Sequence, residues 1–179
     1  MRKALYILGD LDETDIRWMA SVGGRVRVAA GETLIRSGAP VETLYVVIDG
    51  AFAVTLDNGA KIADLAAGDI LGEMSLVEKR PPTVSVTAEA ASTVLAVPQA
   101  ALRARLAAEP AFAARFYRAL AVFLSDRLRS TVARLGYGDG DEGARFEAEN
   151  EIDEGLLDTL HVAGDRMRRL TSLLQGGGR

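Results

Sequence analysis

Between residues 25 and 97 the chain is a series of short segments rich in β-branched residues, each separated from the next by glycine or by a turn sequence. The segments are RVRVA, TLIR, TLYVVID, AFAVTL, KIADL, TVSVTA and STVLAV, and the glycines between them include Gly31, Gly38, Gly50, Gly59 and Gly68. Strands of this length at a spacing of roughly 8–12 residues are typical of an all-β sandwich or barrel. Asn58-Gly59 predicts a type I′ hairpin turn, in which both residues have positive φ.

Helical patterns flank this β region. Residues 12–22 predict a short helix with Asp12 as N-cap and Asp15 three positions later. A second helical pattern starts at Pro98, and a long one opens at Pro110. Its apolar stripe follows the period of an α-helix for about six or seven turns and consists of Phe112, Phe116, Leu120, Phe123, Leu124, Leu128, Val132 and Leu135.

The rest of the chain has two parts of different character. Residues 136–154 hold eight acidic residues and one arginine, which predicts a flexible, self-repelling, glycine-rich acidic linker. Residues 155–179 contain an amphipathic helix and a Gly-rich tail, with apolar residues at alternating spacings of four and three between Leu156 and Leu174. This seam fits either a short coiled coil or a helix that packs back on its own β domain, and the pattern favours neither.

Composition excludes several classes of chemistry. The chain has no cysteine, so disulfides and thiolate metal sites are impossible, and its one histidine, His161, leaves little basis for a metal site or a catalytic triad. Residues 1–135 hold 16 Lys and Arg against 15 Asp and Glu, so we expect no basic face for nucleic acid. No apolar run is long enough to span a membrane. A cytoplasmic protein without a metal cofactor is therefore expected.

Residues 68–88, GDILGEMSLVEKRPPTVSVTA, are the most informative stretch for function. Gly72 allows the backbone to approach a ligand closely at the start of a short helical turn, whose N–H groups suit an anion. The adjacent Glu73 can accept hydrogen bonds from sugar hydroxyls. Together these features predict a pocket for a ribose phosphate.

With the surrounding strands and helices, this stretch resembles the cyclic nucleotide-binding domain family of catabolite-activator type over roughly residues 5–135. Further points of resemblance are Gly31-Glu32 before TLIR, the strand LYVVIDG that ends at Gly50, and Gly68-Asp69. The resemblance implies a mainly β fold with flanking α, in which an antiparallel jelly-roll-type β-roll carries a short N-terminal helix and long C-terminal helices. It also implies that residues 1–135 form the binding domain and that the ligand is cyclic AMP or cyclic GMP.

Site residues follow from the same resemblance. Glu73 matches the glutamate that binds the ribose 2′-hydroxyl. Thr83 matches a small or hydroxyl residue beside the phosphate and base, and Thr131 on the long helix is expected to face the base. The positions whose backbone lines the phosphate are Gly72, Met74 and Ser75.

The sequence departs from the family pattern at the phosphate. Pro82 stands where the family has an arginine that pairs with the cyclic phosphate, and proline carries neither a charge nor an N–H. Loss of one charge-assisted hydrogen bond weakens binding by roughly 1.5–3 kcal/mol. Arg80, two residues earlier, is the candidate replacement, and a solvated loop arginine is the alternative interpretation.

Two functions are consistent with these features. The first is a regulatory or sensor module that binds a cyclic nucleotide and relays its presence through the C-terminal helices. The second is a ligand-free interaction or scaffold protein with the same fold, which Pro82 favours. No partnered base or nucleophile suggests an enzyme, and no winged helix is expected after residue 135. The three phenylalanines of the long stripe predict a homodimer or a protein partner through helices 110–135 and 156–174.

Overall fold

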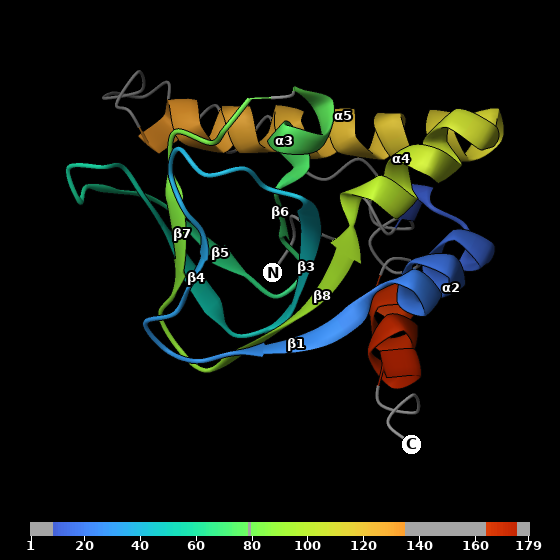
Figure 1. Cartoon of the computed structure of the whole chain (residues 1–179), viewed down its shortest axis with the longest axis horizontal. Helices are drawn as coiled ribbons and strands as arrows, with labels where there is room; N and C mark the ends of the chain where they lie inside the picture. The colour runs from blue at the N-terminus through green and yellow to red at the C-terminus, as the bar shows by residue number, and fades with distance from the viewer. Residues whose placement is uncertain (1–8, 79, 135–163, 175–179) are drawn as a thin grey trace.

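Two four-stranded antiparallel sheets form a roll that is flanked by helices (Figure 1). The computed structural model describes residues 9–78, 80–134 and 164–174. One sheet has the order β1-β8-β3-β6 and the other β2-β7-β4-β5. The strands are β1 (Gly24–Val28), β2 (Thr33–Ile35), β3 (Thr43–Asp49), β4 (Ala51–Thr55), β5 (Lys61–Ala66), β6 (Ile70–Leu71), β7 (Ser85–Ala88) and β8 (Ser92–Pro98). This architecture confirms the predicted antiparallel β-roll with flanking helices.

The structure adds one strand that the sequence pattern did not reveal. Strand β6 has only two residues, and it pairs with Tyr45 and Val46 of β3. Two residues are too few for an alternation of apolar and polar positions to be recognised. This short strand matters because it leads directly into the turn at Gly72.

The turn between β4 and β5 differs from the prediction. Among the described residues no non-glycine residue has a positive φ, so Asn58 cannot occupy a type I′ turn, and only Gly59 is left-handed, with φ of 83°. The Gly59 N–H donates to the Leu56 carbonyl, and the Leu56 N–H donates to the Ala60 carbonyl. A left-handed glycine after an ordinary turn is the pattern of a three-residue hairpin loop with a bulge. The prediction of a type I′ turn was wrong because the loop is one residue longer than that turn needs.

Helices cover one end and one side of the roll (Figure 1). Helix α2 (Glu13–Val22) starts at the predicted N-cap: Asp12 accepts from the Asp15 N–H, and Asp15 accepts from the Asp12 N–H. Helix α4 (Gln99–Ala108) follows β8, and α5 (Pro110–Arg134) is the predicted long helix. The view shows α5 running across the end of the roll, beside α3 (Glu73–Val77).

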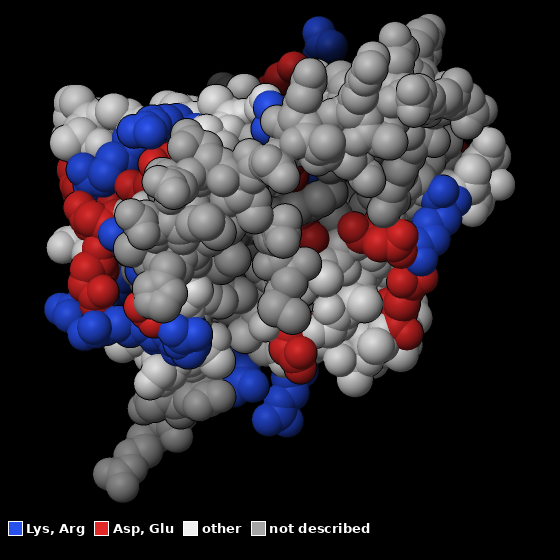
Figure 2. Space-filling model, turned by 180° about the vertical axis from the view of Figure 1, so that it is seen from behind, with Lys and Arg blue, Asp and Glu red and all other residues white. Residues whose placement is uncertain are grey.

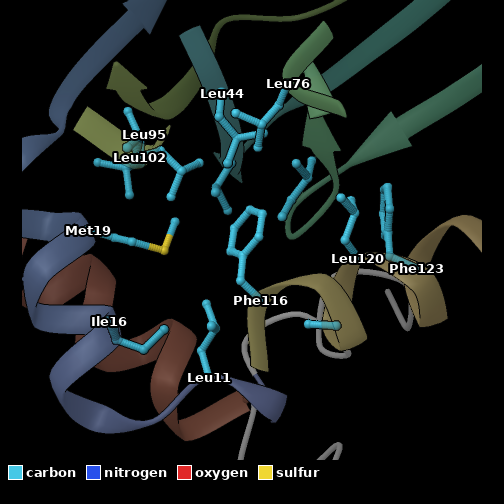
Figure 3. Close-up of a cluster of buried hydrophobic side chains, with 14 of the residues drawn as sticks. Leu11, Ile16, Met19, Leu44, Leu76, Leu95, Leu102, Phe116, Leu120 and Phe123 are labelled. Atoms are coloured by element: carbon cyan, nitrogen blue, oxygen red, sulfur yellow. The ribbon is translucent and has the colours of Figure 1, made fainter. Parts of the chain in front are cut away.

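Successive residues of β3 belong to two different hydrophobic cores. Leu44 and Val46 contribute to the helical core, which contains the apolar faces of α2, α4 and α5, whereas Val47 contributes to the roll core between the sheets. The alternation of a β-strand explains this division, because neighbouring side chains point to opposite faces. In Figure 3, Phe116 of α5 points toward the side chains of α2 and β3.

The phenylalanines of α5 are inside the molecule. Phe112, Phe116 and Phe123 are each about 1% exposed and belong to the helical core. Residues 164–174 form a helix whose Leu170 is fully buried in that same core. Of the two interpretations of the C-terminal seam, the structure therefore favours a helix that packs back on its own domain. The predicted acidic linker 136–154 lies outside the described residues, as does His161.

Charged side chains of both signs are interleaved on the face shown in Figure 2. In the described parts of the chain, no helix has the length and apolar character needed to cross a membrane. The same parts contain no cluster of three acidic or histidine side chains that could hold a metal ion.

Candidate functional site

A tight turn connects β6 to α3 and begins the candidate site. Gly72 is the N-cap of α3 and has φ of 81°, a left-handed conformation that glycine adopts without strain. A Cβ at this position would lie 2.5 Å from the Thr43 carbonyl oxygen of β3. Both the backbone conformation and the lack of space therefore require glycine here, and the turn places Glu73 at the first position of α3.

A cavity of about 80 Å³ lies beside this turn. Most of its wall is apolar and comes from the roll, and its polar side chains are Glu73, Ser75 and Arg127. The apolar lining residues are Ile35, Val41, Val54, Leu65, Leu71, Met74, Pro82, Val84 and Val86. An apolar wall with a few convergent polar groups is typical of a small-molecule site, although such sites usually have at least about 300 Å³.

An ion pair joins α3 to α5 at the edge of the cavity. Arg127 Nη1 lies 2.5 Å from Glu73 Oε1, and Arg127 Nη2 donates to the Ile70 carbonyl at 3.1 Å. The guanidinium also stacks on the Phe123 ring, with 4.6 Å between Cζ and the ring centroid. Arg127 thus bridges the long helix to the strand–turn–helix that carries Glu73.

Burial controls the electrostatics of Glu73, which is only 2% exposed. Burial raises the pKa of its carboxyl above the ordinary value, and the charge of Arg127 acts in the opposite direction. Asp69 adds a smaller upward contribution to the same pKa. Loss of the arginine partner would therefore raise the pKa of the Glu73 carboxyl further and favour its protonated form.

The predicted site residues fall into three groups. The structure brings Gly72, Glu73, Met74, Ser75 and Pro82 together around the cavity. Arg80 and Thr83 are exposed, and neither lines the cavity, although the Ser75 hydroxyl lies 3.5 Å from the Arg80 carbonyl oxygen. Thr131 belongs to the last turn of α5, and its side chain lies outside the described residues.

Arg127 is the cavity residue that the sequence analysis missed. It precedes Thr131 by four positions on α5, so both residues lie on one face of the helix. An arginine one turn before an expected base-facing residue was the available signal. Its partner Glu73 is 54 positions away in sequence, so the pairing itself has no local pattern.

Pro82 is fixed in place by the backbone. Its carbonyl accepts a hydrogen bond of 2.8 Å from the Gly38 N–H, and its ring forms part of the apolar wall. Among the described residues that line the cavity, Arg127 is the one cation. Positive charge at this site therefore comes from α5, whereas the family pattern would place it in the loop after α3.

Comparison with known proteins agrees with the fold. Residues 25–109 match the model of the cyclic nucleotide-binding domain family. An NTE family protein of Mycobacterium tuberculosis is 26% identical over 128 residues, which are 72% of this chain and 22% of that protein. A cAMP-dependent protein kinase regulatory subunit of Blastocladiella emersonii is 28% identical over 150 residues, 76% of this chain and 37% of that protein. The chain thus spans about a fifth to two fifths of these relatives.

A solved structure supports the same assignment at the level of the fold. The crystal structure of a cyclic nucleotide-binding domain from Methylobacillus flagellatus superposes with a TM-score of 0.68 at 23% identity, over 78% of this chain and 84% of that one. In the described parts of the chain, no DNA-binding domain accompanies the roll. The family is regulatory and not catalytic in character. Residues 25–109 thus match the cyclic nucleotide-binding domain family, and the fold of the chain agrees with that match.

Proposed function

We propose that the cavity beside Glu73 binds a cyclic nucleotide, either cyclic AMP or cyclic GMP, and that α5 relays its presence. The observation that carries this proposal is the ion pair between Glu73 of α3 and Arg127 of α5, because it places a carboxylate and a cation at one apolar cavity. The family match supports a nucleotide as ligand. So does the similarity to a regulatory subunit whose name states that its kinase depends on cAMP.

Each polar group has a distinct task in this proposal. Glu73 accepts hydrogen bonds from the ribose hydroxyls, and the backbone of Gly72, Met74 and Ser75 lines the phosphate. Arg127 supplies the positive charge that Pro82 cannot provide. A charge-assisted hydrogen bond of this kind contributes roughly 1.5–3 kcal/mol.

The size of the cavity connects binding to motion. A volume of about 80 Å³ is well below the roughly 300 Å³ of ordinary ligand pockets, so the nucleotide needs an arrangement in which the walls move apart. Arg127 ties one wall to α5, so the ligand and α5 compete for Glu73. A ligand that binds one arrangement more tightly shifts the population of α5 toward it, and a partner protein can read that change.

The second candidate function is a ligand-free interaction protein. Arg127 already occupies the carboxylate that a ribose would need, and Pro82 removes the usual phosphate contact. Both observations suit a domain that kept the roll as a scaffold. A measurement of cyclic nucleotide binding distinguishes the two candidate functions directly.

Pro82→Arg is expected to tighten binding of cyclic AMP or cyclic GMP about tenfold, because it restores one charged hydrogen bond. Glu73→Ala is expected to weaken binding in either background. Isothermal titration calorimetry on ligand-stripped protein measures both effects. Arg80→Ala, at an exposed position outside the cavity, is the matched control and should leave the affinity unchanged.

A thermal-shift measurement without ligand checks that Pro82→Arg has not loosened the loop, because Pro82 also restricts Pro81. A folded Pro82→Arg protein that binds no cyclic nucleotide at millimolar concentration contradicts the sensor function and supports the scaffold. Loss of binding in Arg80→Ala would instead assign the phosphate to Arg80.

Self-association through α5 remains part of the proposal, but the three phenylalanines of the predicted stripe cannot form its surface. The three phenylalanines that motivated a homodimer are buried within one chain, whereas Leu128 of α5 is 65% exposed. If α5 pairs with a second copy, Leu128→Asp should shift a dimer to monomer in sedimentation experiments, with Arg118→Asp as an exposed control on the same helix. A monomer of 19.0 kDa in the unmodified protein at micromolar concentration would contradict self-association.

A further inference from the structure

Two polar side chains of α4 hold the backbone of the turn that carries Glu73. Gln99 Nε2 donates to the Gly72 carbonyl at 3.0 Å, and Arg103 Nη2 donates to the Ser75 carbonyl at 2.9 Å. Arg103 Nη2 also donates to Gln99 Oε1 at 2.8 Å, so the two side chains form one unit. Gln99 is 2% exposed, and neither residue belongs to the cavity lining of the described chain.

These hydrogen bonds stabilise α3, which is too short to be stable by itself. A helix of five residues is far shorter than an isolated helix needs to be stable. The last carbonyls of any helix have no partner within it, and Arg103 satisfies that of Ser75 with a cation, which the helix dipole favours at this end. The Gln99 backbone N–H is itself fixed, because it donates to the Glu42 carbonyl at 2.8 Å.

We propose that Gln99 and Arg103 are positioning residues for Glu73, and that they set how strongly the cavity distinguishes a ribose from a deoxyribose. This inference rests on the proposed nucleotide-binding function. The Gly72 carbonyl belongs to the planar peptide group that includes the Glu73 nitrogen. A hydrogen bond to that carbonyl therefore fixes the orientation of the peptide plane that precedes the Glu73 Cα. The hydrogen bond from Arg103 to the Ser75 carbonyl fixes the backbone two residues after Glu73.

The pair therefore acts on the preference for ribose through Glu73, because both ligands carry the same phosphate and a shift of the backbone that lines it weakens both alike. When the turn is free to shift, the Glu73 carboxylate no longer meets the 2′-hydroxyl in one geometry. The contribution of that hydroxyl to binding falls, whereas the contacts of the phosphate and base are common to the ribose and deoxyribose ligands and do not change the ratio of their affinities. A general loss of folded protein has a different signature, because it weakens every ligand by the same factor.

The test compares cyclic AMP with 2′-deoxy cyclic AMP by calorimetry on the full chain. Wild type is expected to favour the ribose ligand, and Arg103→Met is expected to reduce that preference about fivefold to tenfold, the scale of one hydrogen bond. Arg103→Lys keeps a donor and should restore part of it. Gln99→Leu should act in the same direction as Arg103→Met. Arg118→Met, at an exposed position of α5, is the matched control and should leave the preference unchanged.

Gln99 is buried and its replacement can unfold the chain, so Arg103→Met, at an exposed position, is the deciding variant. An unchanged preference in Arg103→Met, or an equal loss for both ligands, overturns the inference and leaves the nucleotide-binding function intact. Absence of any binding in wild type overturns the proposed function and the role of the pair in affinity.

Hydrogen–deuterium exchange without ligand measures the positioning itself. The Arg103→Met protein should exchange faster in the peptide that covers residues 70–78 and at the wild-type rate in β3 and β8. Unchanged exchange in that peptide overturns the positioning role, whatever the ligands show.

Discussion

Asp15→Ala is expected to lower the free energy of unfolding by about 3–5 kcal/mol, the range for removal of one partner from a buried ion pair. Asp15 is fully buried, and its carboxylate accepts from Arg105 Nη2 at 3.0 Å and from Arg115 Nε at 2.9 Å. The side chain of Arg105 is only 9% exposed, and without Asp15 its ionic partner among the described residues is Glu109, a 53% exposed side chain at 3.1 Å. The same contact raises the pKa of the Arg115 guanidinium, which is consistent with a strong interaction. Urea denaturation at neutral pH measures the loss.

Glu13→Ala on the same helix is the matched control. Glu13 pairs with Arg17 and Arg169, and all three side chains are more than 40% exposed. Exposed pairs contribute roughly 0.2–1 kcal/mol, so this variant should remain close to wild type. A loss below 1 kcal/mol in Asp15→Ala would mean that the buried cluster relaxes or admits water when the carboxylate is removed.

Arg127→Met is expected to destabilise the chain in a manner that depends on pH. At neutral pH the variant leaves the Glu73 carboxylate buried without its cation, which should lower the free energy of unfolding by about 2–3 kcal/mol. This loss is smaller than for a fully buried pair, because the Arg127 side chain is 30% exposed. Removing Arg127 raises the pKa of Glu73 further, because the charge of Arg127 is the largest of the influences that lower it.

The sign of the pH effect follows from proton binding. A carboxyl whose folded pKa is above its unfolded value of 4.5 binds more protons in the folded state between the two values, so stability falls as pH rises through that window. Arg127→Met extends the window upward. The deficit relative to wild type should therefore be small at pH 4 and larger at pH 7.5 when urea denaturation is run at both.

A double variant isolates the origin of that deficit. In Arg127→Met with Glu73→Gln neither position of the pair carries a charge, so most of the stability at pH 7.5 should return, as neutral replacement of both partners predicts. An equal deficit at both pH values, or no recovery in the double variant, would assign the loss to packing of Arg127 on Phe123 and not to charge.

Local patterns in the sequence predicted the elements that local chemistry determines. The capping box of Asp12 and Asp15, the glycine at Gly72 and seven of the eight strands follow from residues close to one another in the chain. The two-residue strand β6 was missed because its pairing with β3, and not its own sequence, defines it.

Interactions between distant residues could not be predicted in the same way. Asp15 was interpreted only as a capping residue, because its partners Arg105 and Arg115 are 90 and 100 positions away. The stripe of phenylalanines on α5 correctly indicated an apolar face, but periodicity alone does not say whether that face meets its own chain or a second copy. Among the candidate site residues, those of the Gly72–Ser75 turn meet at the cavity, whereas the cation comes from Arg127 on α5.

The burial of Leu170 has a consequence for how the molecule is made. The helical core receives side chains from α2 near the start of the described chain and from helix 164–174 near its end. Synthesis runs from the N-terminus, so the roll and α5 leave the ribosome before the residue that completes their shared interior. The many residues between α2 and helix 164–174 add little to the entropic cost of bringing the two together, because that cost grows only with the logarithm of the number of residues between them. Part of the apolar surface of the helical core therefore stays exposed to water in the nascent chain until helix 164–174 emerges.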